Sequence, residues 1–213
     1  MASSGLEGLL PDLNIALNEG QFCDFELRPD RAEAVVLLRL LALPEEGPEP
    51  EDRRVLFRLS GVGRAVASLR AGRWDDASAV VEALALDELG DAVRRFGGVP
   101  IYGWDFFDPE HSWDHWRDRL SLDVTIAGGS RDHVLALSQE SLARPDRILD
   151  LRIWFGDVTA FSTGGEPRSL RDVADGGRRW WDAFYAGDPR TTGHGMAPLR
   201  SGGGPVSPSG AAC

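Results

Sequence analysis

Two histidines spaced four residues apart are the strongest candidates for metal chemistry in the sequence. On a helix, His111 and His115 would face the same side, with Asp108 near the helix start. A metalloprotease helix carries a glutamate between its histidines as general base, and this segment lacks one. A metal-dependent hydrolase that uses these three residues is therefore the enzymatic alternative. We expect neither a bound metal nor another cofactor, and we assign no catalytic residue.

The same segment concentrates acidic and aromatic side chains. Buried tryptophans supply affinity at protein interfaces, whereas carboxylates raise the association rate and select basic partners. The alternative is that the aromatic rings plug the end of the fold while the acids face water. We expect a surface that captures a basic protein, formed by Asp105, Asp108, Glu110, Trp113, Asp114, Trp116 and Asp118.

The net charge narrows the choice of partner. With 34 acidic and 23 basic residues, the formal net charge is -11, and every basic residue is an arginine. Phosphate backbones repel such a chain, so we expect no nucleic-acid binding. A basic protein would be attracted, and it is the partner that we expect.

Nothing in the sequence predicts export or a membrane. The first 21 residues contain three acids and no basic start of a signal peptide. No run approaches the roughly 20 apolar residues needed to cross a bilayer. The two cysteines, Cys23 and Cys213, lie far apart in the chain and do not resemble a disulfide framework. We therefore expect a cytoplasmic protein that binds no membrane.

Apolar runs predict two sets of four strands. The first set covers residues 22–28, 34–43, 54–60 and 62–69, and the second covers residues 120–127, 133–140, 148–155 and 158–161. A helix is predicted over residues 88–96. A second helix begins after Ser169 and is interrupted at Gly176-Gly177. An aromatic strand over residues 99–107 connects the two sets.

The two sets share a local sequence pattern. Residues 52–59 and residues 146–153 both begin with Asp-Arg, and both place a later Arg-aliphatic pair at the same spacing. An accidental likeness of short hairpins is the alternative to an internal repeat. The predicted fold class is α+β, mainly antiparallel β. It consists of two four-stranded meanders, interpreted as an internal repeat, each followed by a helix and packed as a sandwich or a continuous curved sheet.

This interpretation gives one β-rich domain over residues 22–186, made of pseudo-repeats 22–98 and 99–186. Residues 1–21 form a leader with helical character. From Gly187 to Cys213 the chain is rich in glycine, proline and serine and has almost no large apolar side chains. Such a composition predicts a disordered tail over residues 187–213 that the fold can lose.

One resemblance concerns the first third of the chain. Phe22-Cys23-Asp24-Phe25-Glu26-Leu27, a second apolar strand and Val55-Leu56-Phe57-Arg58-Leu59-Ser60-Gly61-Val62 resemble the strand pattern of small bacterial immunity proteins that accompany polymorphic toxins. Cys23 stands where that pattern usually has a histidine. The resemblance implies an acidic, non-catalytic inhibitor of a cognate toxin, and it transfers no functional residue. A structural or regulatory β-scaffold is the remaining alternative.

Overall fold

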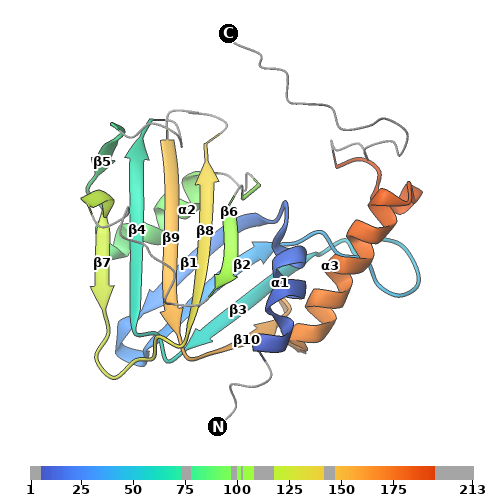
Figure 1. Ribbon diagram of the computed structural model, residues 1–213, viewed down its shortest axis with the longest axis horizontal. Coiled ribbons are helices and arrows are strands. Elements are labelled where there is room, and N and C mark those ends of the chain that lie inside the picture. Colours follow the sequence, from blue (N-terminus) through green and yellow to red (C-terminus); the bar gives the residue numbers. More distant parts are fainter. Residues whose placement is uncertain are drawn as a thin grey trace.

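The computed structural model describes residues 6–72, 78–96, 100–101, 103–107, 118–141 and 147–194, with the backbone alone for 103–107. In these residues the fold is α+β, with three α-helices and mainly antiparallel strands in two sheets (Figure 1). The helices are α1 (Leu10–Leu17), α2 (Leu89–Arg95) and α3 (Leu170–Tyr185). The strands are β1 (Gln21–Arg28), β2 (Glu33–Arg39), β3 (Arg54–Ser60), β4 (Arg64–Ala71), β5 (Val80–Glu82), β6 (Gly103–Phe107), β7 (Leu122–Thr125), β8 (His133–Glu140), β9 (Arg147–Phe155), β10 (Asp157–Phe161) and β11 (Pro167–Arg168).

The two sheets exchange strands. The five-stranded sheet, called the β1 sheet below, has the order β1-β2-β3-β10-β11. The six-stranded sheet, called the β4 sheet, has the order β5-β4-β9-β8-β6, and β7 also pairs with β4. The chain therefore leaves the β1 sheet after β3 to form β4, and it leaves the β4 sheet after β9 to form β10.

The coarse prediction of an α+β, mainly antiparallel fold is confirmed. The predicted equivalence of residues 22–70 and 120–162 as four-stranded meanders is wrong, because β1 pairs with β2 whereas β7 pairs with β4 and not with β8. The fourth strand of a meander would also be an edge strand. β4 is instead paired on both sides, with β9 on one and with β5 and β7 on the other.

The sheets pack over one hydrophobic core. In β3 the buried Val55, Phe57 and Leu59 alternate with exposed or half-buried residues, which is the period of a strand with one buried face. Leu137 of β8 and Leu151 of β9 belong to the same cluster from the facing sheet. The core therefore lies between the β1 sheet and the β4 sheet.

The predicted leader contains α1, and this helix is part of the same core. Leu13 and Leu17 are 0% and 1% exposed. α1 packs against α3 at one end of the two sheets (Figure 1), where Arg178 forms an ion pair with Asp12. Among the helices of the described ranges, none combines the length and the apolar character needed to cross a bilayer.

α3 runs without interruption through the glycines that were expected to break it. A Cβ on Gly177 would overlap Ala16 of α1, so this glycine lets the two helices cross closely. A Cβ on Gly176 would lie 3.4 Å from the Ala42 Cβ, an ordinary contact distance. The missing side chain at Gly177 therefore serves helix packing. Both glycines lower the intrinsic stability of the helix, and packing of the apolar face of α3 offsets this loss.

These neighbouring glycines should respond in opposite ways to alanine. Gly177→Ala should destabilise the protein by about 1–3 kcal/mol, because overpacking forces the helices apart. Gly176→Ala should be neutral or stabilise it by up to about 1 kcal/mol through helix propensity. Thermal unfolding of both variants measures the difference. Equal melting temperatures would contradict the close crossing.

Packed structure continues beyond Gly187, where a disordered tail was expected to begin. A short 3-10 helix covers Pro189–Thr191, and Thr191 is 4% exposed. Arg190 donates to the carbonyl of Gly47 at 3.2 Å. The sequence prediction missed these contacts because they involve polar groups and a single buried threonine rather than an apolar run. Residues 195–213 lie outside the described part of the chain.

Truncation should locate the end of the folded unit. A chain that ends at Ala186 should melt about 5 °C lower than the full chain, the shift that roughly 1–2 kcal/mol produces at this size. A chain that ends at His194 should melt like the full chain, because the composition of the removed segment offers few apolar groups. A full-chain melting temperature for the shorter truncation would show that residues 187–194 add no stability.

Candidate functional site

Most of the acidic and aromatic residues predicted to bind a partner lie outside the described side chains. This holds for Asp108, Glu110, Trp113, Asp114 and Trp116, and for both histidines of the metal hypothesis, His111 and His115. The backbone of Asp105 pairs with Ala136 in the β4 sheet, and Asp118 is exposed. Within the described ranges, no group of three or more His, Cys, Asp or Glu side chains could hold a metal ion.

An open groove of about 570 Å³ runs between β1 and α2, which lies beside β1 (Figure 1). Its polar lining consists of three carboxylates and one guanidinium, and its apolar lining comes from four residues of both walls. We call it the acidic groove. The residues are Asp24, Glu26, Asp87 and Arg94, together with Phe25, Leu27, Leu86 and Leu89.

A β-bulge sets the position of Asp24 on the first wall. The register of β1 against β2 shifts between Phe22 and Asp24, so Cys23 is the extra residue. Phe22 and Phe25 consequently both point into the core although they are three residues apart, and their ring centroids lie 6.4 Å from each other. Burial raises the pKa of the Cys23 thiol, which keeps it protonated at neutral pH.

The second wall approaches closely because Gly90 has no side chain. A Cβ at this position would lie 2.8 Å from the carbonyl oxygen of Phe25. Leu89, next to it, is 1% exposed and anchors α2 in the core. The preceding 3-10 turn, Leu86–Glu88, is closed by the Glu88 carboxylate, which accepts the backbone N–H of Ala85 at 3.0 Å. This turn presents Asp87 at the groove.

Two of the groove carboxylates are paired with arginines of the chain itself. Asp24 accepts Arg94 across the groove at 2.6 Å, and Arg94 also pairs with Asp91. Glu26 pairs with Arg28, which lowers the pKa of the Glu26 carboxyl. These side chains are about half exposed, so water screens the pairs strongly.

Asp87 is the third carboxylate, and it differs from the other two. It is exposed, and no hydrogen bond or ion pair to its side chain is found among the described residues. The lining of the groove contains acids, one arginine and apolar residues, without a histidine, cysteine or serine among the described side chains. This chemistry suits the binding of a cation with an apolar stem, such as an arginine or lysine side chain.

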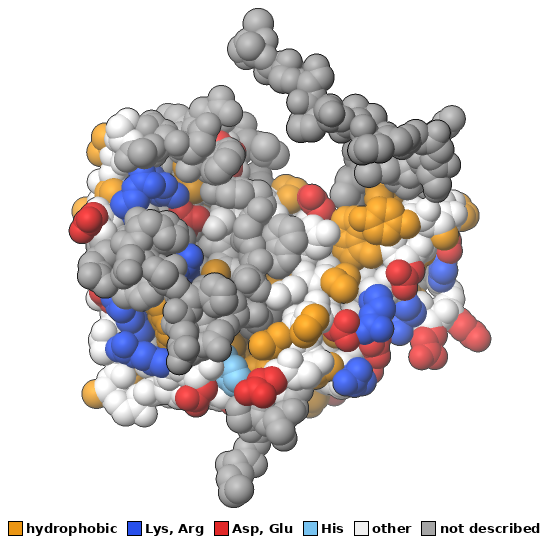
Figure 2. Space-filling model, viewed as in Figure 1, with side chains coloured by type: hydrophobic (Ala, Val, Ile, Leu, Met, Phe, Trp, Pro, Cys, Tyr) orange, Lys and Arg blue, Asp and Glu red, His pale blue; other side chains and the backbone are white. Residues whose placement is uncertain are grey.

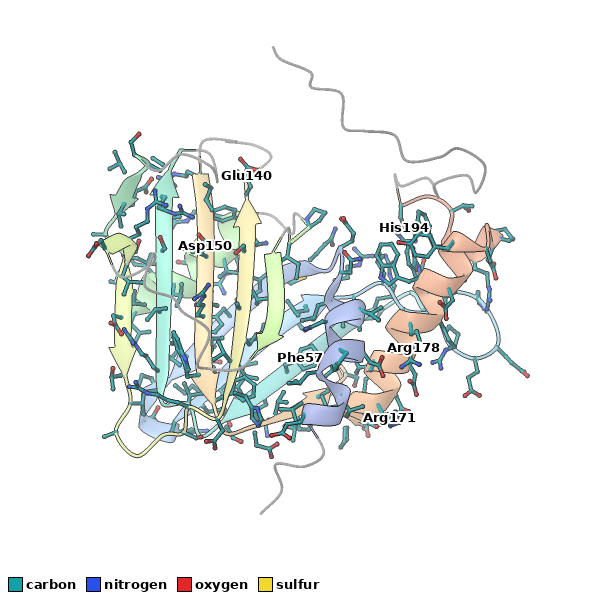
Figure 3. The ribbon with its side chains drawn as sticks, in the orientation of Figure 1. Phe57, Glu140, Asp150, Arg171, Arg178 and His194 are labelled. Carbon is teal, nitrogen blue, oxygen red and sulfur yellow. The ribbon has the colours of Figure 1, made fainter. Side chains whose placement is uncertain are left out.

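A buried ion pair lies elsewhere, on the β4 sheet. Arg70 and Asp150 pair across β4 and β9 and are 6% and 5% exposed. Asp150 lies between Leu149 and Leu151, which belong to the core, so it points to the opposite face of the sheet (Figure 3). The charged residues at alternate positions of a buried strand were the sequence signal for this pair. The strand prediction for residues 148–155 did not use that signal.

Removing one partner of this pair should be more damaging than removing both. Arg70→Leu should cost about 3–5 kcal/mol of stability, because it removes the direct ion-pair partner of the buried Asp150 carboxylate and leaves only a weaker interaction with Arg152. The double variant Arg70→Leu/Asp150→Leu should recover most of that loss. Arg31→Leu, which breaks an exposed pair with Asp30, is the control and should change stability by less than about 1 kcal/mol. Additive effects in chemical denaturation would show that the pair is not coupled.

A second polar cluster joins the C-terminal segment to the loop before β3. The Glu49 carboxylate accepts Arg53 at 2.6 Å and the Trp180 indole N–H at 3.1 Å, and His194 Nε2 lies 3.0 Å from its other oxygen. Trp180 is fully buried, and Figure 3 shows His194 beside the end of α3. The cluster contains no cysteine or serine to act as a nucleophile, and its contacts account for how residues 187–194 dock.

Hydrophobic side chains also gather over α1 and α3 on the face seen in Figure 2. Ile15 of α1 and Tyr185 of α3 are 40% and 62% exposed. The indole N–H of Trp181 is buried and has no partner among the described residues. Charged side chains of both signs, including the paired Asp12 and Arg178, lie beside this patch (Figure 2) and do not favour a partner of one charge, so the acidic groove remains the stronger candidate.

Comparisons with known proteins give no match to this chain. No protein-family model, no curated protein and no solved structure matches it. The function therefore has to be inferred from the chemistry of the groove and from the sequence.

Proposed function

We propose that this chain is a non-catalytic binding protein of the immunity type, and that its acidic groove takes basic side chains of a partner protein. The observation that carries the proposal is the groove itself, whose lining combines the exposed Asp87 and two further acids with apolar residues. The formal net charge of -11 supports a cationic partner. The resemblance of the first third of the chain to immunity proteins supports the class, although it transfers no functional residue.

The charges of the groove would act mainly on the rate and the selectivity of binding. Exposed ion pairs contribute about 0–1 kcal/mol each, so three carboxylates alone do not give a stable complex. They raise the association rate and orient the partner, while apolar contacts supply affinity. Leu27 and Leu86, both half-buried, offer such contacts to the aliphatic stem of a lysine or arginine.

The proposal extends to the fold. β1-β2-β3 are followed in their sheet by β10-β11, and β6-β8-β9 are followed by β4-β5. The segments with the matching Asp-Arg pattern lead into β3 and β9. β3 is thus the third strand counted from β1 in one sheet, and β9 is the third strand counted from β6 in the other. We interpret this as an internal repeat in which each half lends its later strands to the sheet of the other, within an arrangement of the β-sandwich kind. The segment from Asp105 to Asp118 remains a predicted extension of the binding surface.

Charge reversal in the groove should weaken capture of a basic protein. We expect the wild-type chain to retain a lysine- or arginine-rich protein from cell extract at low ionic strength. With that protein purified, Asp87→Arg should slow association about threefold to tenfold, because it removes an attractive charge and adds a repulsive one at the site. Biolayer interferometry over a range of salt concentrations measures the rate.

The matched control is Asp182→Arg on α3. Asp182 is exposed, and its reversal changes the net charge by the same amount away from the groove. Its association rate should stay within about twofold of the wild-type rate. Equal slowing by both variants would show that only the overall charge matters. Retention of no basic protein by the wild-type chain would contradict the proposed function.

A further inference from the structure

The backbone of β1 has an outer edge that can be assigned residue by residue. In an antiparallel ladder, residues alternate between those that hydrogen-bond to one neighbour and those that face away from it. The N–H of Leu40, just after β2, donates to the carbonyl of Arg53, next to β3, at 3.1 Å. The backbone N–H and C=O groups of the even-numbered residues of β2, which include Val36 and Ala34, therefore point towards β3 and away from β1.

The residues of β1 that lie opposite these two consequently point their backbone N–H and C=O groups outward, away from β2. Phe25 is opposite Val36, and Leu27 is opposite Ala34. A second observation agrees, since the N–H of Phe25 donates to the Asp24 carboxylate at 2.9 Å. The N–H and C=O groups of Phe25 and Leu27 thus point away from the β1 sheet, towards α2 and the groove.

Three positions along this edge differ in what covers them. At its start, Ile101 donates to the carbonyl of Gly20 at 2.8 Å, next to a bridge between Gln21 and Pro100. In the middle, α2 covers Phe25 at its closest approach. At Leu27, no hydrogen bond to the backbone is found within the described residues. This open edge lies in the lining of the acidic groove.

We propose that the partner enters the acidic groove as an extended segment and forms a pair of backbone hydrogen bonds with Leu27. This inference rests on the proposed function and specifies how the partner is recognised. An exposed strand edge binds an extended chain through its main-chain groups, and pockets beside the edge select its side chains. Here the selecting group is the Asp87 carboxylate, so the segment carries an arginine or lysine near the residue that pairs with Leu27.

Proline at Leu27 tests the backbone contact. Leu27→Pro removes the outward N–H and leaves the hydrogen bonds between β1 and β2 intact, because proline is tolerated at an outward position of an edge strand. Leu27→Ala removes the same side chain and keeps the N–H. The probe is a fluorescent decapeptide of alternating arginine and valine, and binding is followed by anisotropy at low salt. The proline variant should bind it at least fivefold more weakly than the alanine variant.

A fully N-methylated form of the same peptide gives a second test that does not depend on folding of the proline variant. It keeps the charges but cannot donate backbone hydrogen bonds, so the wild-type chain should bind it at least fivefold more weakly. Equal binding of both peptides, or no saturable binding of the unmodified peptide, overturns the strand-addition proposal. The proposed function is tested separately by Asp87→Arg. If that variant weakens binding while both backbone tests fail, the groove binds cations but not by strand addition.

Discussion

The arrangement of both sheets depends on one close crossing of the chain, where β3 passes into β4 and β9 passes into β10. A Cβ on Gly63 would overlap the carbonyl oxygen of Ser130, so only glycine fits this crossing. Backbone hydrogen bonds replace side-chain packing there. Ser130 donates to Gly61 at 2.7 Å, and Gly156 donates to Ser60 at 3.0 Å. Without this approach, neither strand could reach the sheet that contains the other half of the chain.

The crossing has two consequences for the rest of the molecule. First, each sheet is held by a strand from the other half, and the buried pair of Arg70 and Asp150 joins β4 to β9 across that boundary. Second, β10 and β11 extend the β1 sheet on its β3 side, and β1 forms the opposite edge, with its outward backbone beside α2. The acidic groove lies along this edge, between β1 and α2.

The sequence predicts local structure well here and long-range pairing poorly. Alternation of apolar and polar residues in 54–60 correctly predicts β3, and the cap at Ser169 correctly marks the start of α3. Alternation cannot say which sheet a strand joins, and β4, which is buried on both faces, was therefore assigned to a meander. Gly177 reads as a helix breaker until its contact with Ala16 is known. The groove joins residues about 60 positions apart, which no local pattern connects.

The internal pairing of Arg94 explains why charge alone cannot make the groove selective. Asp24 already has a counter-charge in Arg94, as Glu26 has in Arg28. An incoming cation gains little from either acid unless it displaces the arginine, and a chain with a net charge of -11 attracts any cationic protein. Selectivity must then come from groups that still lack a partner among the described residues. Those are the Asp87 carboxylate and the backbone of Leu27, which line the same groove and together favour an extended basic segment over a diffuse positive surface.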